Sequence, residues 1–304
     1  MSVSEQMLES ALRKLIFATM TALGIGYILV NIATTILLGY FLSEFTISSV
    51  QIVIEMCGMI LFLLASIAMV TLGILFIIGG LQYYRGDKPK GVIFLGTQLA
   101  SFYLLCLGTG SALLLPQINV YVALLIIGPI FIMIGTAFHV LRPFHFQLIS
   151  SILGIVGGAL LAFVILDLQI FVSVFGEWNV PFSGPFMSMT ILEAAALILG
   201  SVAVSVHSIL GKYRKSPVKY VFFPIATLVY GTGVFIGSLI HSLGLLDLIW
   251  KAPWLPPLYG VPAWVINTTI FWAAGLIFLS AAGIMLVISS YMGFHFATSV
   301  SKEE

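Results

Sequence analysis

The chain is poor in charge. Only 8% of its 304 residues are Asp, Glu, Lys or Arg, whereas about a quarter of the residues of a soluble globular domain are charged. Since 61% of the residues belong to the apolar and aromatic set, there are too few polar side chains to cover a water-facing surface. This composition excludes a soluble enzyme, a basic nucleic-acid binder and a disordered chain, and it indicates an integral membrane protein.

Cysteine and catalytic motifs are also scarce. The two cysteines, Cys57 and Cys106, both lie in apolar stretches, and we expect them to be buried, unbridged thiols rather than a disulfide or a metal pair. No HExxH run, Walker loop or GxSxG elbow occurs in the sequence, so no motif supports zinc, nucleotide or serine hydrolase chemistry. A non-enzymatic role is therefore favoured, and no catalytic residue or metal site is predicted.

Long apolar runs predict an all-α integral membrane protein with eight transmembrane helices. An unpaired backbone amide is costly in hydrocarbon, so each run of about 20 apolar residues should form a membrane-spanning helix. We expect residues 4–15, which lead into the first of these runs, to form a short amphipathic helix at the inner interface. The predicted spans are Leu15–Leu42, Val50–Gln82, Gly91–Leu115, Val120–Leu141, Gln147–Leu166, Met187–Leu210, Val221–Leu246 and Ala263–Met292.

The basic residues are divided unequally between alternate connections. Of the twelve Lys and Arg residues, all but Lys251 fall before the first span, after the second, fourth and sixth, or after the eighth. By the positive-inside rule this side of the membrane is cytoplasmic, so both termini are predicted to be cytoplasmic in a multi-pass protein of the cell membrane. Several acids, among them Glu55, Glu193 and Asp247, instead fall at or near the predicted outer boundary.

Short motifs recur in the same order in two halves of the chain. They are LGI at 23–25 and 153–155, YR at 84–85 and 213–214, and FHF at 144–146 and 294–296. These matches suggest a parallel duplication of a four-helix unit, with a first repeat at 1–146 and a second at 147–304 that carries an extra outer loop at about 247–263. Chance matches between apolar segments are the alternative.

Polar residues and glycines within the spans suggest how the helices pack. We expect Asn31 and Gln98 to be satisfied by neighbouring helices, and we find no ionisable residue convincingly placed at mid-membrane. GxxxG spacings occur at Gly154 and Gly158 and again at Gly233 and Gly237. They predict close helix contacts, either within the bundle or between subunits.

Two histidines are the candidate cofactor ligands. His139 and His207 fall at similar depth in the inner third of their predicted spans, where two imidazoles can ligate a haem b iron from opposite sides. The competing interpretation is that they are ordinary interfacial side chains.

Two predicted outer loops are rich in proline and tryptophan. Proline stiffens a loop, while indole rings favour the headgroup layer or a protein interface. The two loops therefore predict either an interfacial aromatic belt or a docking surface for a protein partner. No nucleic-acid partner is predicted. The candidate partner-binding residues are Trp178, Trp250, Trp254 and Trp264.

Three functions are compatible with these features. The first is a polytopic membrane subunit or anchor of a multi-protein complex, such as a respiratory electron-transfer complex, whose outer loops dock an extracytoplasmic partner. The second is a transporter or lipid-handling protein with a path between two repeats. The third is a membrane cytochrome subunit that binds haem b through His139 and His207.

Overall fold

The computed structural model describes residues 3–44, 49–87, 90–114 and 268–303, with Thr46 and scattered positions between 123 and 134 and between 224 and 242. All regular structure in these residues is helical. The long helices are α1 (Val3–Glu44), α2 (Val50–Tyr84), α3 (Lys90–Leu114) and α10 (Thr269–Glu303). Of the four predicted spans between Val120 and Leu246, Gln147–Leu166 and Met187–Leu210 lie wholly outside the described residues, whereas Val120–Leu141 and Val221–Leu246 are described in part and are helical there.

Three of these helices are long and apolar enough to cross a bilayer. The apolar stretches are Gln6–Tyr40, Val50–Tyr84 and Ile270–His295, and α3 carries a shorter one, Phe94–Gly110. At 1.5 Å per residue, a stretch of 26 residues or more exceeds the hydrocarbon thickness of about 30 Å. The prediction of several long apolar helices is confirmed, and the second and third predicted spans match α2 and α3 to within two residues.

The N-terminal segment differs from its prediction as a short interfacial helix. Residues from Val3 onward are helical, and they continue without a break into the first span as part of α1. No proline or glycine occurs between Val3 and Ala22, and most of these residues are strong helix formers, so nothing in the local sequence ends the helix at the interface.

Local sequence explains both ends of α2. The side chain of Ser49 accepts a hydrogen bond from the backbone N–H of Ile52 and caps the first turn. At the other end Gly86 has φ +90°. Its N–H donates to the Tyr83 carbonyl, and the N–H of Asp87 donates to the Gln82 carbonyl. This is a Schellman motif, in which glycine avoids the steric cost of a left-handed residue.

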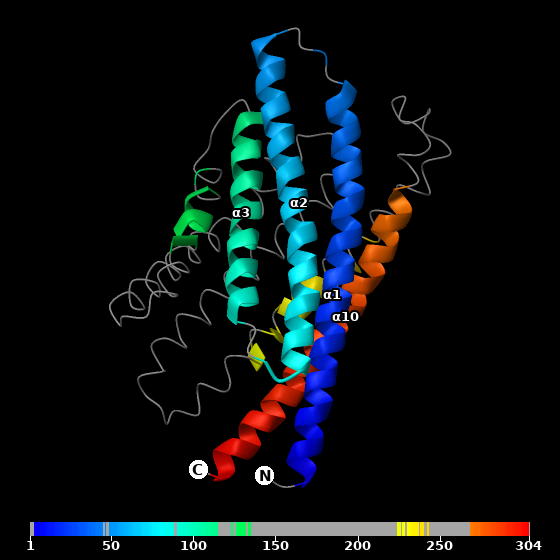
Figure 1. The fold of residues 1–304 in the computed structure, drawn as a ribbon, viewed down its shortest axis with the longest axis vertical. Helices are drawn as coiled ribbons and strands as arrows, with labels where there is room; N and C mark the ends of the chain where they lie inside the picture. Colours follow the sequence, from blue (N-terminus) through cyan, green and yellow to red (C-terminus); the bar gives the residue numbers. More distant parts are fainter. Residues whose placement is uncertain are drawn as a thin grey trace.

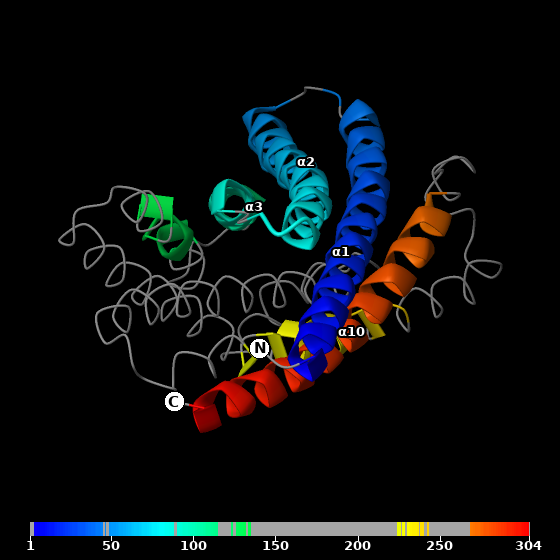
Figure 2. The same ribbon diagram turned by 60° about the horizontal axis from the view of Figure 1, so that its bottom comes forward.

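The helices pack in the order α3, α2, α1 and α10 (Figure 1). In Figure 2, α2 and α3 lie on one side of α1, while α10 crosses α1 obliquely on the other. The beginning of α1 and the end of α10 lie at the same end of the bundle. This placement of the two chain ends is the one that an even total number of spans would give.

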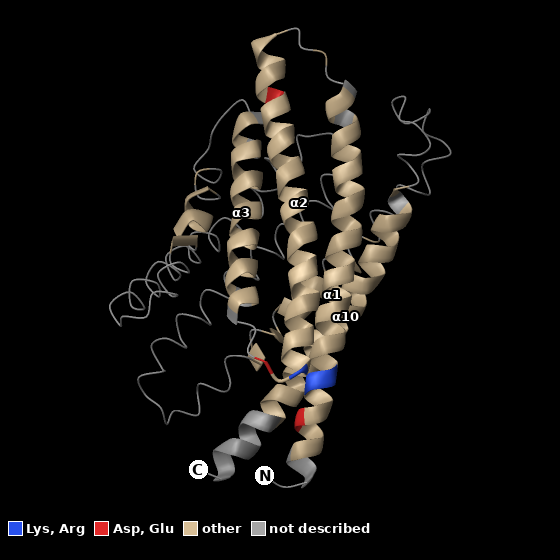
Figure 3. Cartoon of the chain, in the orientation of Figure 1, with Lys and Arg blue, Asp and Glu red and all other residues tan. Residues whose placement is uncertain are grey.

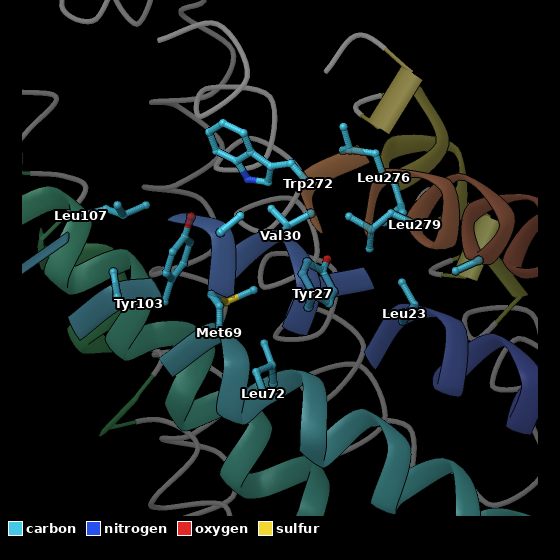
Figure 4. Packing of buried hydrophobic residues seen from close by; sticks show 14 of the residues in the cluster. Leu23, Tyr27, Val30, Met69, Leu72, Tyr103, Leu107, Trp272, Leu276 and Leu279 are labelled. Carbon is cyan, nitrogen blue, oxygen red and sulfur yellow. The ribbon is translucent and has the colours of Figure 1, made fainter. Parts of the chain in front are cut away.

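A hydrophobic core runs along α1. Tyr27 and Val30 of α1 lie between Met69 of α2, on one side, and Leu276 and Leu279 of α10 on the other (Figure 4). The outward faces are apolar as well: Ile277 of α10, for example, is 70% exposed. Because a soluble protein rarely exposes aliphatic side chains in such numbers, these faces suit a hydrocarbon solvent.

Pairs of glycines bring the helices into backbone contact. A Cβ atom placed on Gly24 of α1 would lie 2.5 Å from the carbonyl oxygen of Gly73 in α2, and one on Gly73 would lie 2.7 Å from that of Gly24. On another face of α1, a Cβ on Gly26 would lie 3.0 Å from the Gly275 carbonyl oxygen in α10. No side chain separates the helices at these crossings, so their backbones touch directly.

Glycines also bring backbones into contact at two further helix crossings. A Cβ atom on Gly110 of α3 would lie 3.1 Å from the Gly58 carbonyl oxygen of α2, and one on Gly283 of α10 would lie 2.9 Å from the carbonyl oxygen of Gly231. Close helix packing at glycines is therefore present in the described residues, and the packing predicted at the GxxxG pairs is not tested. Of those pairs, Gly154, Gly158 and Gly237 lie outside the described residues.

The two cysteines differ from each other. Cys106 is buried in α3, as expected, whereas Cys57 is exposed on α2, so the prediction of a second buried thiol is wrong. Cys57 is followed on α2 by an apolar sequence, as Cys106 is preceded by one on α3. Composition alone therefore does not distinguish it from a core position.

Candidate functional site

A pair of tyrosines forms the most notable polar contact between distant parts of the chain. The hydroxyl oxygens of Tyr27 in α1 and Tyr230 lie 2.9 Å apart, within hydrogen-bonding distance. The Tyr27 side chain is 2% exposed, and its ring stacks on Phe76 of α2 with centroids 5.8 Å apart. Tyr27 thus links α1 with α2 and with a helical residue about 200 positions later in the chain.

Three polar residues of α1 near Tyr27 bond to carbonyls of their own helix, whereas the buried hydroxyls of Thr21 and Thr35 have no hydrogen-bond partner among the described residues. The side-chain amide of Asn31 donates to the Tyr27 carbonyl at 2.9 Å, and the Thr34 hydroxyl donates to the Val30 carbonyl at 3.0 Å. Thr19 bonds to Leu15 in the same way. The expectation that Asn31 depends on a neighbouring helix is thus corrected, because a carbonyl one turn earlier is within reach of its short side chain.

Gln98 of α3 does bond to another part of the chain. Its side-chain nitrogen donates to the Met133 carbonyl at 3.1 Å, as the sequence predicts for a polar residue within a span. The longer Gln side chain reaches beyond its own helix, which the shorter Asn side chain does not do here.

Hydroxyl groups also join α10 to residues 224–242. The side-chain oxygens of Ser238 and Ser280 lie 2.8 Å apart, and the buried Ser290 hydroxyl donates to the Pro224 carbonyl at 2.6 Å. Together with the tyrosine pair, these contacts form a polar seam, which we define as Tyr27, Tyr230, Ser238, Ser280 and Ser290. Each member is a neutral hydroxyl, so the seam can position helices or line a path for polar groups, but it supplies no fixed charge.

Basic side chains gather at one end of the described bundle. Arg13 and Glu9 form an ion pair of 2.6 Å on α1, and the Arg13 guanidinium also reaches the turn after α2, where its Nη1 lies 3.3 Å from a Cβ position on Gly86. All the basic residues coloured in Figure 3 lie towards the end where α1 begins and α2 ends. This clustering agrees with the unequal charge distribution seen in the sequence.

The site residues predicted from the sequence lie outside the described residues. They are the proposed haem ligands His139 and His207 and the proposed partner-binding residues Trp178, Trp250, Trp254 and Trp264. Their roles remain predictions. Within the part of the chain that the structure describes, no three His, Cys, Asp or Glu side chains come together as a metal site.

The fifth tryptophan has a different environment. Trp272, in the first turn of α10, is 5% exposed and belongs to the hydrophobic core, where it lies near Val30 of α1 (Figure 4). It follows the predicted outer loop by only a few residues. The loop that carries Trp254 and Trp264 therefore leads into a helix that is anchored in the bundle.

Comparison of the chain with protein-family models, with curated proteins and with solved structures finds no match. The polar seam, the glycine crossings and the charged end of the bundle are therefore the basis for functional inference.

Proposed function

We propose that the protein is a polytopic integral membrane subunit or anchor of a multi-protein membrane complex. In this proposal the chain crosses the cell membrane eight times as two parallel four-helix repeats, and both termini are cytoplasmic. The observation that carries the proposal is the direct glycine contact at each of the four crossings described above. Backbones that touch leave little room for one helix to move against the next, which suits a rigid scaffold better than a moving one.

The outer loops supply the docking surface in this proposal. The loop at about 247–263 leads into α10, and α10 is held against α1 by the Gly26 and Gly275 contact and by the buried Trp272. A loop stiffened by proline and fixed at its base loses little conformational entropy when a partner binds. Exposed indole rings on such a loop are typical anchors of an interface. An extracytoplasmic redox protein of a respiratory complex is one partner of this kind.

Purification from native membranes under mild detergent tests the proposal. We expect the protein to co-purify with at least one partner, and the double substitution Trp254→Ala and Trp264→Ala to release that partner without lowering membrane insertion. Ile277→Ala is the control. Ile277 is 70% exposed on α10, so its substitution by alanine removes exposed apolar area at a position away from the loop. A protein that purifies alone, or a partner that the double variant retains, would contradict the proposal.

The topology can be tested separately. The duplication and the cytoplasmic termini place Lys88 and Lys215 on the inner side, after the second and sixth spans. A membrane-impermeant amine reagent added to intact cells should therefore leave both unlabelled, and should label them once the membrane is opened. Labelling of either lysine in intact cells would refute the eight-span topology.

The polar seam favours a second candidate, a transporter or lipid-handling protein. Tyr27 belongs to the first proposed repeat and Tyr230 to the second, and their hydroxyl contact lies at the junction where such a path would run. In proteoliposomes this candidate predicts a flux of lipid or solute that Tyr27→Phe changes. The subunit proposal predicts no flux, so a flux that depends on Tyr27 would displace it.

A further inference from the structure

A row of exposed apolar side chains runs along one face of α2. Its members are spaced alternately by four and three residues, which keeps them on one side of a helix. Thr71 lies in the same row, and its hydroxyl donates to the Ile67 carbonyl at 3.0 Å, so its polar group is satisfied within the helix. We call this row the α2 stripe. Its other members are 37–47% exposed and are Ile60, Leu64, Ile67, Ile74, Ile78 and Leu81.

The next position of the stripe is a cation. Arg85 follows Leu81 by four residues, and its backbone is still helical, with φ −72° and ψ −8° and its N–H donating to the Leu81 carbonyl. The Schellman turn at Gly86 then ends the helix. The Arg85 side chain is exposed, and it leaves α2 on the same face as Leu81 and Ile78. An apolar stripe therefore ends in a guanidinium group at the basic end of the bundle.

The neighbouring charges leave Arg85 available for a ligand. Arg13 of α1 is already paired with Glu9, and this is the only ion pair among the residues that the structure describes. Lys14 is exposed on the adjacent helix, while the acid nearest in sequence, Asp87, is exposed and forms no ion pair with Arg85. A Phe17 and Tyr84 ring contact of 5.4 Å holds α1 beside this end of α2.

The half of the stripe nearest Arg85, from Thr71 to Leu81, has the length of one lipid leaflet. From Leu81 to Thr71 there are ten residue steps, or about 15 Å of helix, which is half of a hydrocarbon core of about 30 Å. An acyl chain of the inner leaflet can therefore cover Leu81, Ile78 and Ile74 while its phosphate stays level with Arg85. Guanidinium binds phosphate through two parallel hydrogen bonds, which an ammonium group does not match.

We propose that Arg85 and the inner half of the α2 stripe form a binding site for one phospholipid with an anionic headgroup. The phosphate and headgroup charge bind at Arg85, with Lys14 nearby, and an acyl chain lies along Leu81, Ile78 and Ile74. Anionic lipids are concentrated in the cytoplasmic leaflet, where basic clusters recognise them. This inference rests on the proposed topology, in which α2 spans the membrane with Arg85 on the cytoplasmic side, and it does not depend on the function of the complex.

Native mass spectrometry of the full chain in detergent tests the site. The protein is titrated with phosphatidylglycerol, with phosphatidylcholine of the same acyl chains, and with glycerol phosphate. We expect phosphatidylglycerol to bind about fivefold more tightly than phosphatidylcholine, because the choline ammonium offsets the phosphate charge whereas phosphatidylglycerol keeps a net negative charge. Arg85→Gln should abolish this preference and Arg85→Lys should restore part of it. The matched control Lys302→Gln removes the same charge from the end of α10 and should leave the preference unchanged.

Three outcomes would overturn the proposal. Equal losses in Arg85→Gln and Lys302→Gln would show that only the overall charge matters. Glycerol phosphate that competes with the lipid at equal concentration would identify a site for a free anion rather than for a lipid. A dimer mass without bound phosphatidylglycerol, unchanged in Arg85→Gln, would show that a second copy of the chain covers the stripe.

Discussion

Replacing Gly24 by alanine should push α1 and α2 apart. The new Cβ would lie 2.5 Å from the Gly73 carbonyl oxygen and 2.5 Å from Cγ1 of Ile77, whereas ordinary van der Waals contact begins at 3.4 Å. The carbonyl belongs to the backbone and has no rotamer to change, so the helices must separate by nearly 1 Å. A gap of that size forfeits a quarter to a half of the dispersion energy of the atom pairs it separates. We expect the free energy of unfolding to fall by about 1–3 kcal/mol, as for other overpacked cores.

Gly39 provides the matched control on the same helix. A Cβ atom placed there meets nothing within 4 Å, so Gly39→Ala should be neutral or should stabilise α1 by about 0.5–1 kcal/mol through helix propensity. The two variants make the same chemical change, and only the surroundings differ.

The buried thiol of Cys106 offers the assay. In a Cys57→Ser background, a thiol-reactive fluorophore reports heat unfolding in detergent, because Cys106 is 3% exposed in the folded chain. Gly24→Ala should lower the melting temperature relative to Gly39→Ala. The double variant of Gly24 and Gly73 should cost less than the sum of the single variants, because the first separation already makes room for the second. Equal melting temperatures for Gly24→Ala and Gly39→Ala would refute the backbone contact between α1 and α2.

Two further predictions concern single contacts. Tyr27→Phe and Tyr230→Phe should each lower the free energy of unfolding by about 0.5–1.5 kcal/mol. In the same thermal assay, the double variant should reveal a coupling energy of about 0.6 kcal/mol, the average for hydrogen bonds between membrane helices. Strictly additive effects of the two substitutions would argue against the hydroxyl pair. Gly86→Ala should lower the free energy of unfolding by about 1 kcal/mol or more, because alanine disfavours φ +90°. Gly91→Ala is the control and should leave stability unchanged, because a Cβ atom on Gly91 meets nothing within 4 Å. Equal melting temperatures for the two variants would count against the Schellman turn.

The spans in the described part of the chain could be predicted from the sequence because their signal is local. Hydrocarbon requires every backbone amide to be paired within a helix, so run length and charge alone locate α1, α2 and α3 to within a few residues, apart from the N-terminal extension of α1. The ends follow local chemistry as well. Ser49 and Gly86 are recognisable as caps by residue type and position.

The tyrosine pair and the choice of glycines could not be predicted in the same way. Gly26 and Gly275 resemble the other glycines of the chain in sequence, and what singles them out is that each faces the other's backbone from a distant helix. Tyr230 gives no local sign that its hydroxyl meets Tyr27. Periodicity predicts which face of a helix is buried, but it carries no information on which helix buries it.

The contact between α1 and α10 has a consequence for biogenesis. Gly26 and Gly275 are 249 positions apart, and at about 5–20 residues per second the ribosome needs roughly 12–50 s to make the intervening chain. During that time the face of α1 that carries Gly26 is without its final neighbour α10. Assembly around α1 is therefore completed only after α10 has entered the bilayer, and a nascent chain stalled before that point should be a preferred substrate for membrane quality control.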